Sequence, residues 1–443
     1  MLTEKEARTV IEKILSSSKA DEVEVTMSGG TQQHLRFARN TPSTSGLSSN
    51  DVVSIRTTFG KRSGVATVNQ LDDASLRSTV QRSEELARLA PEDPEHMPAL
   101  GPQKYPSIKG YDERTARGAT EILANGAAEC IKQAKAKNLV AAGFIRTNAG
   151  FTALGNSKGL FGYHRATNVF FSETVRTPEG DGSGWVTRAS HRGSDLNFKE
   201  LSKIAIDKAV LSAKPRELKP GKYVTILEPS CVADMIQGLG FSMDARSADE
   251  GRSFFSKKGG GNLIGEKIFP ENVTIYSDPN DPQVPGSPWG AGGLPQKRVE
   301  WITDGVLQNL VYSRFWAEKQ RKEPVPFPSN IIMKGGTGSL DDLIKSTKEG
   351  VLVTSIWYIR SVDPRTLLLT GLTRDGVFWI ENGKIAYPVM NFRWNDSPVN
   401  VLKNIDAMSR SMRVPPRESQ SGSIMVPALR IKEFNFTSLS EAV

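Results

Sequence analysis

Runs of alternating or β-branched residues, separated by short turns that contain glycine, recur at both ends of this chain. Gly60-Lys61, Asp375-Gly376 and Asn382-Gly383 each separate two such runs. Turns of this kind join antiparallel neighbours, because glycine, asparagine and aspartate tolerate positive φ. The sequence therefore predicts antiparallel sheet at both ends of the chain. The expected strands are 22–27, 34–38, 52–59, 62–68, 139–147, 223–227, 298–303, 351–360, 367–373, 377–381 and 384–391, with hairpin character over 151–175.

Helical patterns alternate with these strands and predict an α+β fold. In the first, Thr3 and Glu6 have the spacing of a capping box, and Ala7, Ile11 and Ile14 share one face. Further helices are expected at 73–90, 115–137, 198–213 and 340–345, and one begins near Ser230.

The segment 216–222 is the best candidate for a domain boundary, because charged residues and a Pro-Gly turn join a helix to a new strand there. We expect an N-terminal α/β domain at 1–215 and a β-rich α+β domain at 222–443. The predicted architecture is therefore two α/β domains with mixed and antiparallel sheets.

Composition narrows the class of protein. The N-terminus is charged, and no apolar run approaches the roughly 18 residues of a membrane span, so a cytoplasmic protein without a membrane segment is expected. Cys130 and Cys231 lie far apart, which predicts two reduced, buried thiols. The net charge is +8, but lysines and arginines are scattered among 49 acidic residues, so no nucleic-acid site is expected.

The distribution of histidine limits the chemistry further. The four histidines are His34, His96, His164 and His191, so more than half of the chain has none. None has a second histidine three to five residues away, the spacing that places two ligands on one helix face. Catalysis within residues 192–443 must therefore use other side chains or other subunits.

Three further groups of residues have ordinary structural interpretations beside functional ones. Ser230 and Cys231 follow a strand as a nucleophile can, but the glycine-flanked elbow is missing, so a buried helical position is favoured. The loop 334–339 could bind phosphate but lacks the Gly-Lys-Ser/Thr ending, so a helix cap is favoured. The acids at 244, 249 and 250 lack an ordered calcium-loop pattern, so a solvated turn is favoured over a cation site.

Several stretches resemble the TldD/PmbA family, also called modulators of DNA gyrase, and specifically its PmbA (TldE) branch. They are 221–229, 251–266, 285–286, 304–309, 371–384 and 427–431, and the N-terminal series of helix and strands is of the same kind. The resemblance spans nearly the whole chain and implies the fold of a metallopeptidase.

In the TldD branch, a His-Glu-x-x-x-His motif on the helix after the first strand of this domain binds zinc, and a later cysteine completes the site. The matching positions here are 236–241, where Ile236, Gln237 and Phe241 replace the two histidines and the glutamate. No cysteine follows Cys231. The resemblance therefore implies no catalytic residue, metal ligand or cofactor in this chain, and a second domain that is a degenerate metallopeptidase. The same helix has an apolar stripe, at Val232, Met235, Ile236 and Leu239, that is typical of core packing.

The resemblance also implies a partner. Members of this branch pair with a TldD-like subunit that holds the zinc, and the pair cleaves unstructured peptides, including leader peptides. We expect this chain to be the non-catalytic subunit, which completes the substrate channel and holds an extended peptide along exposed strand edges. A homodimer of the lone chain stays open, as does the alternative of a basic adaptor that binds DNA or gyrase without proteolysis. A peptidase with Ser230 or Cys231 as nucleophile is a third possibility.

Overall fold

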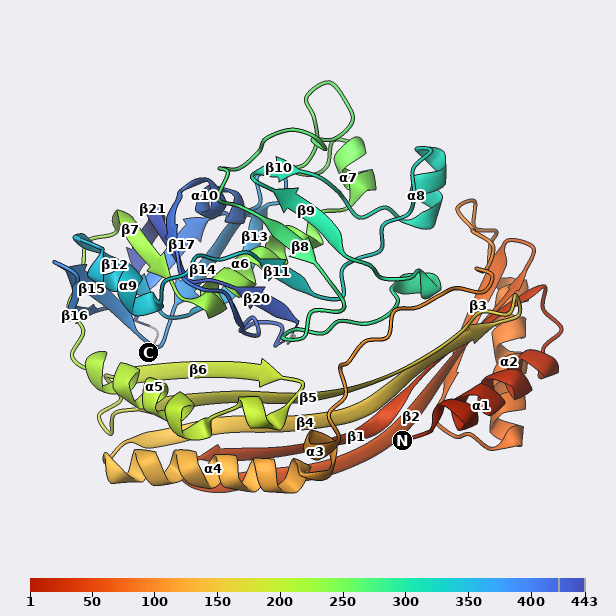
Figure 1. Ribbon diagram of the computed structural model, residues 1–443, viewed down its shortest axis with the longest axis horizontal. Coiled ribbons are helices and arrows are strands. Elements are labelled where there is room, and N and C mark those ends of the chain that lie inside the picture. Colours follow the sequence, from red (N-terminus) through yellow and green to blue (C-terminus); the bar gives the residue numbers. More distant parts are fainter. Residues whose placement is uncertain (421–422, 442–443) are drawn as a thin grey trace.

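A computed structural model describes residues 1–420 and 423–441 (Figure 1). It confirms the α+β prediction, with helices packed on three sheets of six, six and nine strands in the described residues. One long sheet from the N-terminal half runs beneath the C-terminal half, which carries the other two sheets (Figure 1). None of the described helices is both long enough and apolar enough to cross a bilayer.

The N-terminal sheet is antiparallel throughout, in the order β3-β2-β1-β4-β5-β6. The turn at Gly60-Lys61 joins β2 to β3, as predicted. The strands β1, β2, β4 and β5 have 16 to 19 residues, so at about 3.3 Å per residue they extend roughly 55 Å. The bounds are β1 Glu22–Ala38, β2 Thr41–Phe59, β3 Arg62–Val68, β4 Val140–Asn156, β5 Phe161–Arg176 and β6 Ser183–Ser190.

Strand β1 corrects one prediction, because the expected strands 22–27 and 34–38 are one continuous strand. The intervening Gly29-Gly30 pair does not end it, since β1 is paired on both sides, with β2 and β4. Gly30 has φ 142° and lies so close to β4 that a Cβ would come within 2.3 Å of the Ala149 carbonyl oxygen. Glycine here permits close contact between the strands.

Helices pack against the two ends of this sheet (Figure 1). At one end, α1 (Glu4–Ser17) and α2 (Asp73–Leu89) bury Ile11 and Ile14, and the predicted capping box of Thr3 and Glu6 is confirmed. At the other end, α4 (Ala119–Ala136) and α5 (Phe198–Leu211) cover a second core. The single helix predicted at 115–137 is wrong: Gly118 separates α3 (Glu113–Arg117) from α4. A short 3₁₀ helix, η1, spans Gly193–Asp195.

The C-terminal half begins with β7, which pairs in parallel with β12 near the middle of the nine-stranded sheet. The elements are β7 Gly221–Leu227, α6 Pro229–Phe241, α7 Ala245–Asp249, β8 Ile275–Ser277, η2 Ala291–Gly293, β9 Val299–Thr303, β10 Val306–Leu307, α8 Arg314–Lys319, β11 Ile331–Met333, α9 Leu340–Lys345, β12 Glu349–Val353, β13 Ile356–Asp363, β14 Leu368–Thr373, β15 Val377–Glu381, β16 Lys384–Val389, β17 Phe392–Asp396, α10 Pro398–Lys403, β18 Ile405–Met408, β19 Met412–Arg413, β20 Ile424–Val426 and β21 Leu429–Leu439.

Two predictions about this half are wrong. The strand expected at 351–360 is two strands, β12 and β13, which occupy different places in the sheet. Asp375-Gly376 is not a hairpin turn, because β14 pairs with β13 and β17 whereas β15 pairs with β12 and β16. Tertiary contacts explain the difference, since Thr354 Oγ1 donates to the carbonyl oxygen of Asp375 and fixes this connection against β12. Asn382-Gly383 does join β15 to β16, as predicted.

Candidate functional site

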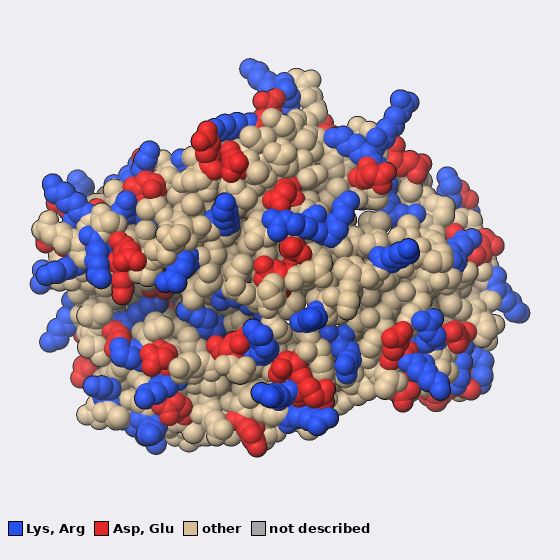
Figure 2. All heavy atoms as spheres, in the orientation of Figure 1, with Lys and Arg blue, Asp and Glu red and all other residues tan. Residues whose placement is uncertain are grey.

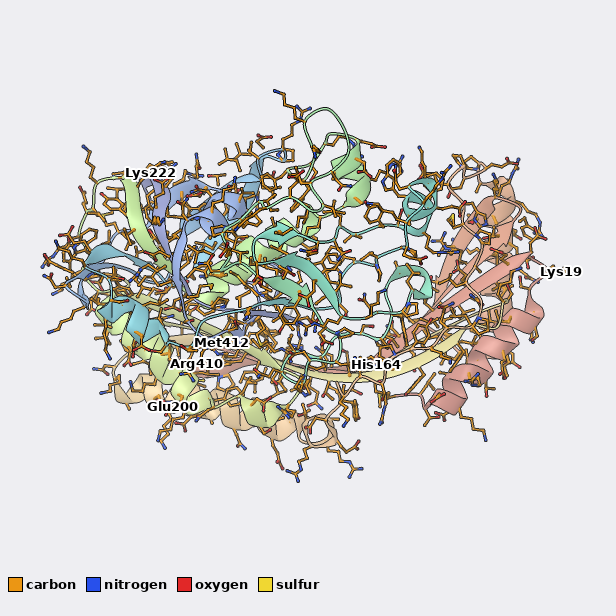
Figure 3. All side chains as sticks on the ribbon, turned by 45° about the horizontal axis from the view of Figure 1, so that its top comes forward. Lys19, His164, Glu200, Lys222, Arg410 and Met412 are labelled. Atoms are coloured by element: carbon orange, nitrogen blue, oxygen red, sulfur yellow. The ribbon has the colours of Figure 1, made fainter. Side chains whose placement is uncertain are left out.

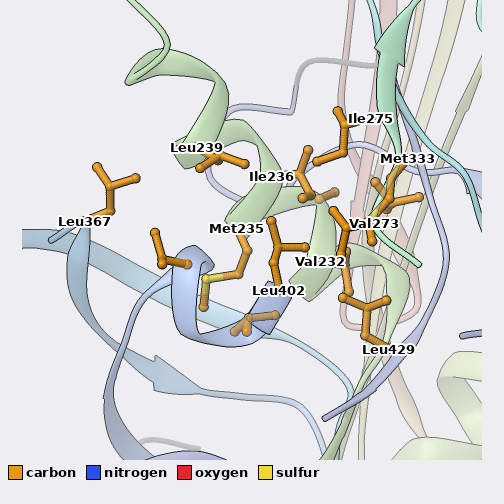
Figure 4. Close-up of a cluster of buried hydrophobic side chains, with 14 of the residues drawn as sticks. Val232, Met235, Ile236, Leu239, Val273, Ile275, Met333, Leu367, Leu402 and Leu429 are labelled. Atoms are coloured by element: carbon orange, nitrogen blue, oxygen red, sulfur yellow. The ribbon is translucent and has the colours of Figure 1, made fainter. Parts of the chain in front are cut away.

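Helix α6 carries the positions at which the family resemblance locates a zinc motif. It follows β7 directly, with Pro229 in its first turn, where a missing N–H costs nothing. Figure 4 shows Val232, Met235 and Ile236 among apolar side chains from several other elements. Ile236 is 2% exposed and lines a void of only about 10 Å³. This face of α6 is therefore a tightly filled core.

The other two positions lie elsewhere on the helix. Gln237 is half-buried, and Phe241, the last residue of α6, is 65% exposed. Its ring stacks on Phe327, with 5.8 Å between ring centroids and 16° between planes. The structure thus brings an aliphatic, an amide and an aromatic side chain to these three positions, and none of these side chains ligates zinc as His, Cys, Asp or Glu does.

The histidines are distributed over the N-terminal half. His34 packs near Phe144, His164 lies edge-on to Trp289, and His191 Nδ1 lies 3.4 Å from an Arg413 guanidinium nitrogen. His96 Nε2 lies 3.7 Å from a Glu22 carboxylate oxygen. Within residues 1–420 and 423–441, no three His, Cys, Asp or Glu side chains gather as a metal site requires.

Ser230 and Cys231 are held by backbone carbonyls rather than by a catalytic base. The Ser230 hydroxyl donates to the Thr354 carbonyl oxygen at 3.2 Å, and the Cys231 thiol donates to that of Val353 at 3.6 Å. Burial raises the pKa of the Cys231 thiol well above its usual value, so the nucleophilic thiolate is disfavoured. These contacts favour the structural interpretation. Both Cys130 and Cys231 are buried and free, as predicted.

The loop 334–339 has the contacts of a helix cap. Ser339 and Asp342 form a capping box at the start of α9. Gly335 and Gly336 approach the backbone at residues 408–411 so closely that a Cβ would come within 2.6 Å of backbone oxygen atoms. The glycines of this loop therefore serve packing against a neighbouring segment.

The acidic residues at 244, 249 and 250 each have a separate partner. Asp244 caps α7, Asp249 accepts hydrogen bonds from Asn262 and the Trp316 indole, and Glu250 pairs with two arginines. The predicted solvated turn is instead the short helix α7 and its caps, and the oxygens of these acids bond to protein donors.

A cleft of about 650 Å³, which we call the interdomain cleft, lies between the two halves of the chain. One wall is formed by β6 and α5, and the other by the start of α9 and the segment around β19. Figure 3 labels Arg410 and Met412 on the second wall. Its lining is largely apolar with a few charges, and includes Trp185, Thr187, Ile204, Lys208, Leu340 and Met412. A cleft of this size and composition is typical of a ligand site.

Strand β6 presents a free edge to this cleft, because it is the last strand of the N-terminal sheet. The backbone N–H and C=O of Ser183 bond to the Ser212 hydroxyl instead of to β5, so the backbone groups of alternate residues up to Ala189 point outward. Two outward carbonyls have side-chain donors: Lys208 Nζ lies 3.4 Å from Trp185 O, and Arg188 Nη1 lies 2.8 Å from Thr187 O. No strand pairs with this edge in the described residues, and an added strand would pair there by displacing these side-chain donors.

One ion pair and one hydrogen bond join the two halves of the chain around the cleft. Lys208 on α5 and Glu228, which precedes α6, are 2.7 Å apart, with side chains 14% and 13% exposed. Deeper in the structure, Asp375 accepts a 2.6 Å hydrogen bond from Ser183 and lies 2.7 Å from an Arg417 guanidinium nitrogen. These contacts hold the wall formed by β6 against the C-terminal half.

Sequence reasoning did not find this cleft. Its walls come from segments around 185, 208, 340 and 412, which no motif links, and the free edge of β6 depends on which strands pair. Ile204 and Leu211, in the helix predicted at 198–213, are apolar residues that the structure leaves exposed, and they were the sign in the sequence that this helix borders a binding surface.

Comparisons with known proteins agree with this architecture. Three domain models of the PmbA/TldA metallopeptidase family match residues 23–87, 110–213 and 220–438 as domain 1, the central domain and the C-terminal domain. The models thus divide the part N-terminal to residue 215 into two domains, whereas β1 to β6 form one sheet across both.

Individual relatives are distant in sequence. Metalloprotease PmbA of Escherichia coli O157:H7 is 23% identical over 94% of this chain and 93% of its own length. A metalloprotease of Methanothermobacter thermautotrophicus is 27% identical, but the match spans only 49% of each chain. The solved structure of TldE from Thermococcus kodakarensis has a TM-score of 0.86 at 18% identity, covering 97% of this chain and 100% of that one. Taken with the matches of the domain models, these similarities show that the chain belongs to the PmbA/TldD family of metallopeptidase-like proteins.

Proposed function

We propose that this chain is the non-catalytic, TldE-like subunit of a cytoplasmic zinc peptidase with two kinds of subunit. A TldD-like partner supplies the zinc and the hydrolytic chemistry. This chain helps to form the substrate channel and holds an unstructured peptide, such as the leader of a precursor, in an extended conformation.

The observation that carries the proposal is the packing of α6. Where the catalytic branch of the family has two histidines and a glutamate, this chain has a buried Ile236, an amide at Gln237 and an exposed, stacked Phe241. Zinc-dependent hydrolysis needs nitrogen, sulfur or carboxylate ligands and a group that activates water. These three side chains supply neither.

The interdomain cleft supports the peptide-holding part of the proposal. An extended peptide pairs its backbone with a strand edge regardless of sequence, and its alternate side chains enter adjoining pockets. β6 is an edge strand, and a peptide backbone would pair with it by displacing the side-chain donors on the Trp185 and Thr187 carbonyls. Ile204, Leu340 and Met412 supply an apolar lining. Figure 2 shows acidic and basic side chains interspersed over the face in view, an arrangement that does not favour the alternative of a DNA-binding adaptor.

The test compares the lone chain with its complex with a TldD-like partner, by metal analysis and by cleavage of an unstructured peptide. We expect zinc and cleavage in the complex and neither in the lone chain. Stoichiometric zinc with cleavage by the lone chain would falsify the proposal, as would a complex with a catalytically inactive partner that still cleaves.

A matched pair of variants tests the cleft. Ile204 on α5 lines it, whereas Val210 on the same helix does not and is 55% exposed. In the complex, Ile204→Arg should raise KM for the peptide by about tenfold, the effect of losing about 1.4 kcal/mol of binding, with kcat little changed. Val210→Arg should leave both constants unchanged. Equal effects of the two substitutions would exclude the cleft as the peptide site.

A further inference from the structure

A second hollow, of about 670 Å³, lies along the same sheet and is lined by aromatic rings. Four rings face it from three separate segments: Tyr105 and Tyr111 precede α3, Tyr163 lies on β5, and Trp289 lies in the loop before η2. His164, labelled in Figure 3, lies among them, and the rest of the lining includes Pro106, Pro288 and residues 1–4. We call this hollow the aromatic groove.

Hydrogen bonds to backbone carbonyls fix two of the rings of the groove. The Tyr105 hydroxyl donates to the Gly293 carbonyl oxygen at 2.8 Å, and the Tyr163 hydroxyl donates to that of Leu2 at 2.7 Å. Trp289 packs on Tyr105, with 5.0 Å between ring centroids, and lies so close to Gly162 that a Cβ there would come within 2.8 Å of the indole. The ring faces are therefore pre-organised, which reduces the entropy that a ligand must overcome.

Both signs of charge line the groove: the Arg165 guanidinium and the Met1 ammonium are cationic, and Glu4 is acidic. The Arg165 guanidinium lies 4.3 Å from the centre of the Tyr111 ring, and Glu4 is the acidic group of the lining. Burial lowers the pKa of His164 to about 4, so this imidazole is neutral at neutral pH. A cationic ligand would meet Arg165 and the Met1 ammonium, and an anionic ligand would meet Glu4, so neither sign of charge is favoured over a neutral ligand.

We propose that the aromatic groove binds a neutral, proline-containing peptide segment in the polyproline II conformation. Proline rings pack on flat aromatic faces, and this conformation leaves every backbone carbonyl unpaired. The Tyr111 hydroxyl and the Trp289 indole N–H supply donors of the kind that such carbonyls accept. Because the conformation is already populated in unfolded peptides, little ordering entropy opposes binding.

The position of the groove relates it to the interdomain cleft. His164 and Ser172 both lie on β5, and Ser172 pairs with Thr187 of the cleft wall. Eight residues at about 3.3 Å separate the two points by roughly 26 Å. A polyproline II chain, at about 3.1 Å per residue, covers that distance in about nine residues. This extension rests on the proposed function: one unstructured peptide would place a proline-containing segment in the groove and a neighbouring segment in the cleft.

The experiment measures binding of a fluorescein-labelled decaproline peptide to the lone chain by fluorescence polarisation. Trp289→Ala and Tyr111→Ala should each weaken binding by about tenfold or more, as for an aromatic anchor. Tyr111→Ala guards against a folding defect of the tryptophan variant, and both variants are checked by thermal melting. Tyr358→Ala is the matched control, because Tyr358 also lies beneath an arginine, 4.2 Å from its ring centre, but is on β13 and outside the groove.

Any of the following results would overturn the proposal. The first is decaproline binding that neither groove variant weakens, or no binding by a normally folded chain. The second is a glycine-serine peptide of equal length binding equally well. The third is an oligoarginine peptide that binds more tightly and loses affinity in the same variants, which would assign the groove to cations. None of these measurements uses zinc or cleavage, so the two proposals are tested separately. The proposed function can fail while decaproline still binds, and decaproline binding can fail while the complex still cleaves.

A linked peptide tests the extension to the cleft. A proline triplet joined by about nine residues to an apolar segment should bind the wild-type chain more tightly than either part, because linkage raises the effective concentration of the second part. The gain should disappear in Ile204→Arg. If the wild type shows no gain, the groove and the cleft do not share one peptide.

Discussion

Replacing Ile236 by alanine tests most directly whether α6 is a packed core. The substitution removes three buried carbon atoms, for which the lost transfer free energy is about 2.5 kcal/mol at about 0.8 kcal/mol each. The neighbouring void of about 10 Å³ and the partners Ile275 and Trp301, which lie on strands, leave little room for collapse, so a cavity cost adds to the transfer cost. We expect the free energy of unfolding to fall by about 4 kcal/mol.

Urea unfolding followed by tryptophan fluorescence suits this measurement, because Trp301 is buried in the same cluster as Ile236. Ile236→Val should cost about 1 kcal/mol. Val210→Ala, on the exposed side of α5, should change stability by about 0.5 kcal/mol at most. If Ile236→Ala costs no more than Val210→Ala, α6 is not packed as described, and the interpretation of Ile236 as a core residue is refuted.

Three further predictions concern buried polar groups. Glu228→Gln leaves the Lys208 ammonium buried without its partner and should lower stability by about 3 kcal/mol in thermal unfolding, whereas a loss below about 1 kcal/mol would class the pair with surface ion pairs. Burial raises the pKa of Glu173 from 4.5 to about 7, so as pH rises the unfolded chain loses this proton before the folded chain does. The free energy of unfolding should therefore fall by on the order of 3 kcal/mol between these two pH values. Glu173→Gln should remove most of this pH dependence in thermal melts at several pH values. Neither Cys130 nor Cys231 should react with a maleimide until the chain is unfolded, and labelling of the native protein counted by mass spectrometry would contradict their burial.

Local signals in the sequence predicted local structure well. The capping box of Thr3 and Glu6 and the Asn382-Gly383 turn are each decided by residues within a few positions of one another, and both are confirmed. Asp375-Gly376 has an equally good turn sequence but joins strands that are not neighbours in the sheet. Its role depends on Thr354 and Ser183, which lie 21 and 192 residues away, so no local pattern could reveal it.

In the candidate site, too, features set by neighbouring residues could be predicted and features set by distant contacts could not. The sequence predicted one buried face of α6 from the apolar stripe at Val232, Met235, Ile236 and Leu239. This was possible because the residues of one helix face recur every three or four positions. The interdomain cleft and the aromatic groove are formed by side chains that meet only after the long sheet is built. Gly162 illustrates this: its sequence neighbours give no sign that Trp289, 127 residues later, packs against it.

The geometry of α6 also bears on how far this chain is from a metal site. Positions 236 and 241 are five residues apart, about 140° around a regular helix, so two ligands there meet one metal only if the last turn directs the second side chain back toward the first. Here Ile236 enters the core while Phe241 is 65% exposed and stacks on Phe327. The two side chains lie in different environments, Ile236 in an apolar core and Phe241 at the surface. Two histidine substitutions alone would place one imidazole in an apolar core and the other in solvent. An apolar core at Ile236, where a metal ligand would be needed, is consistent with the proposal that this chain holds the substrate and the partner hydrolyses it.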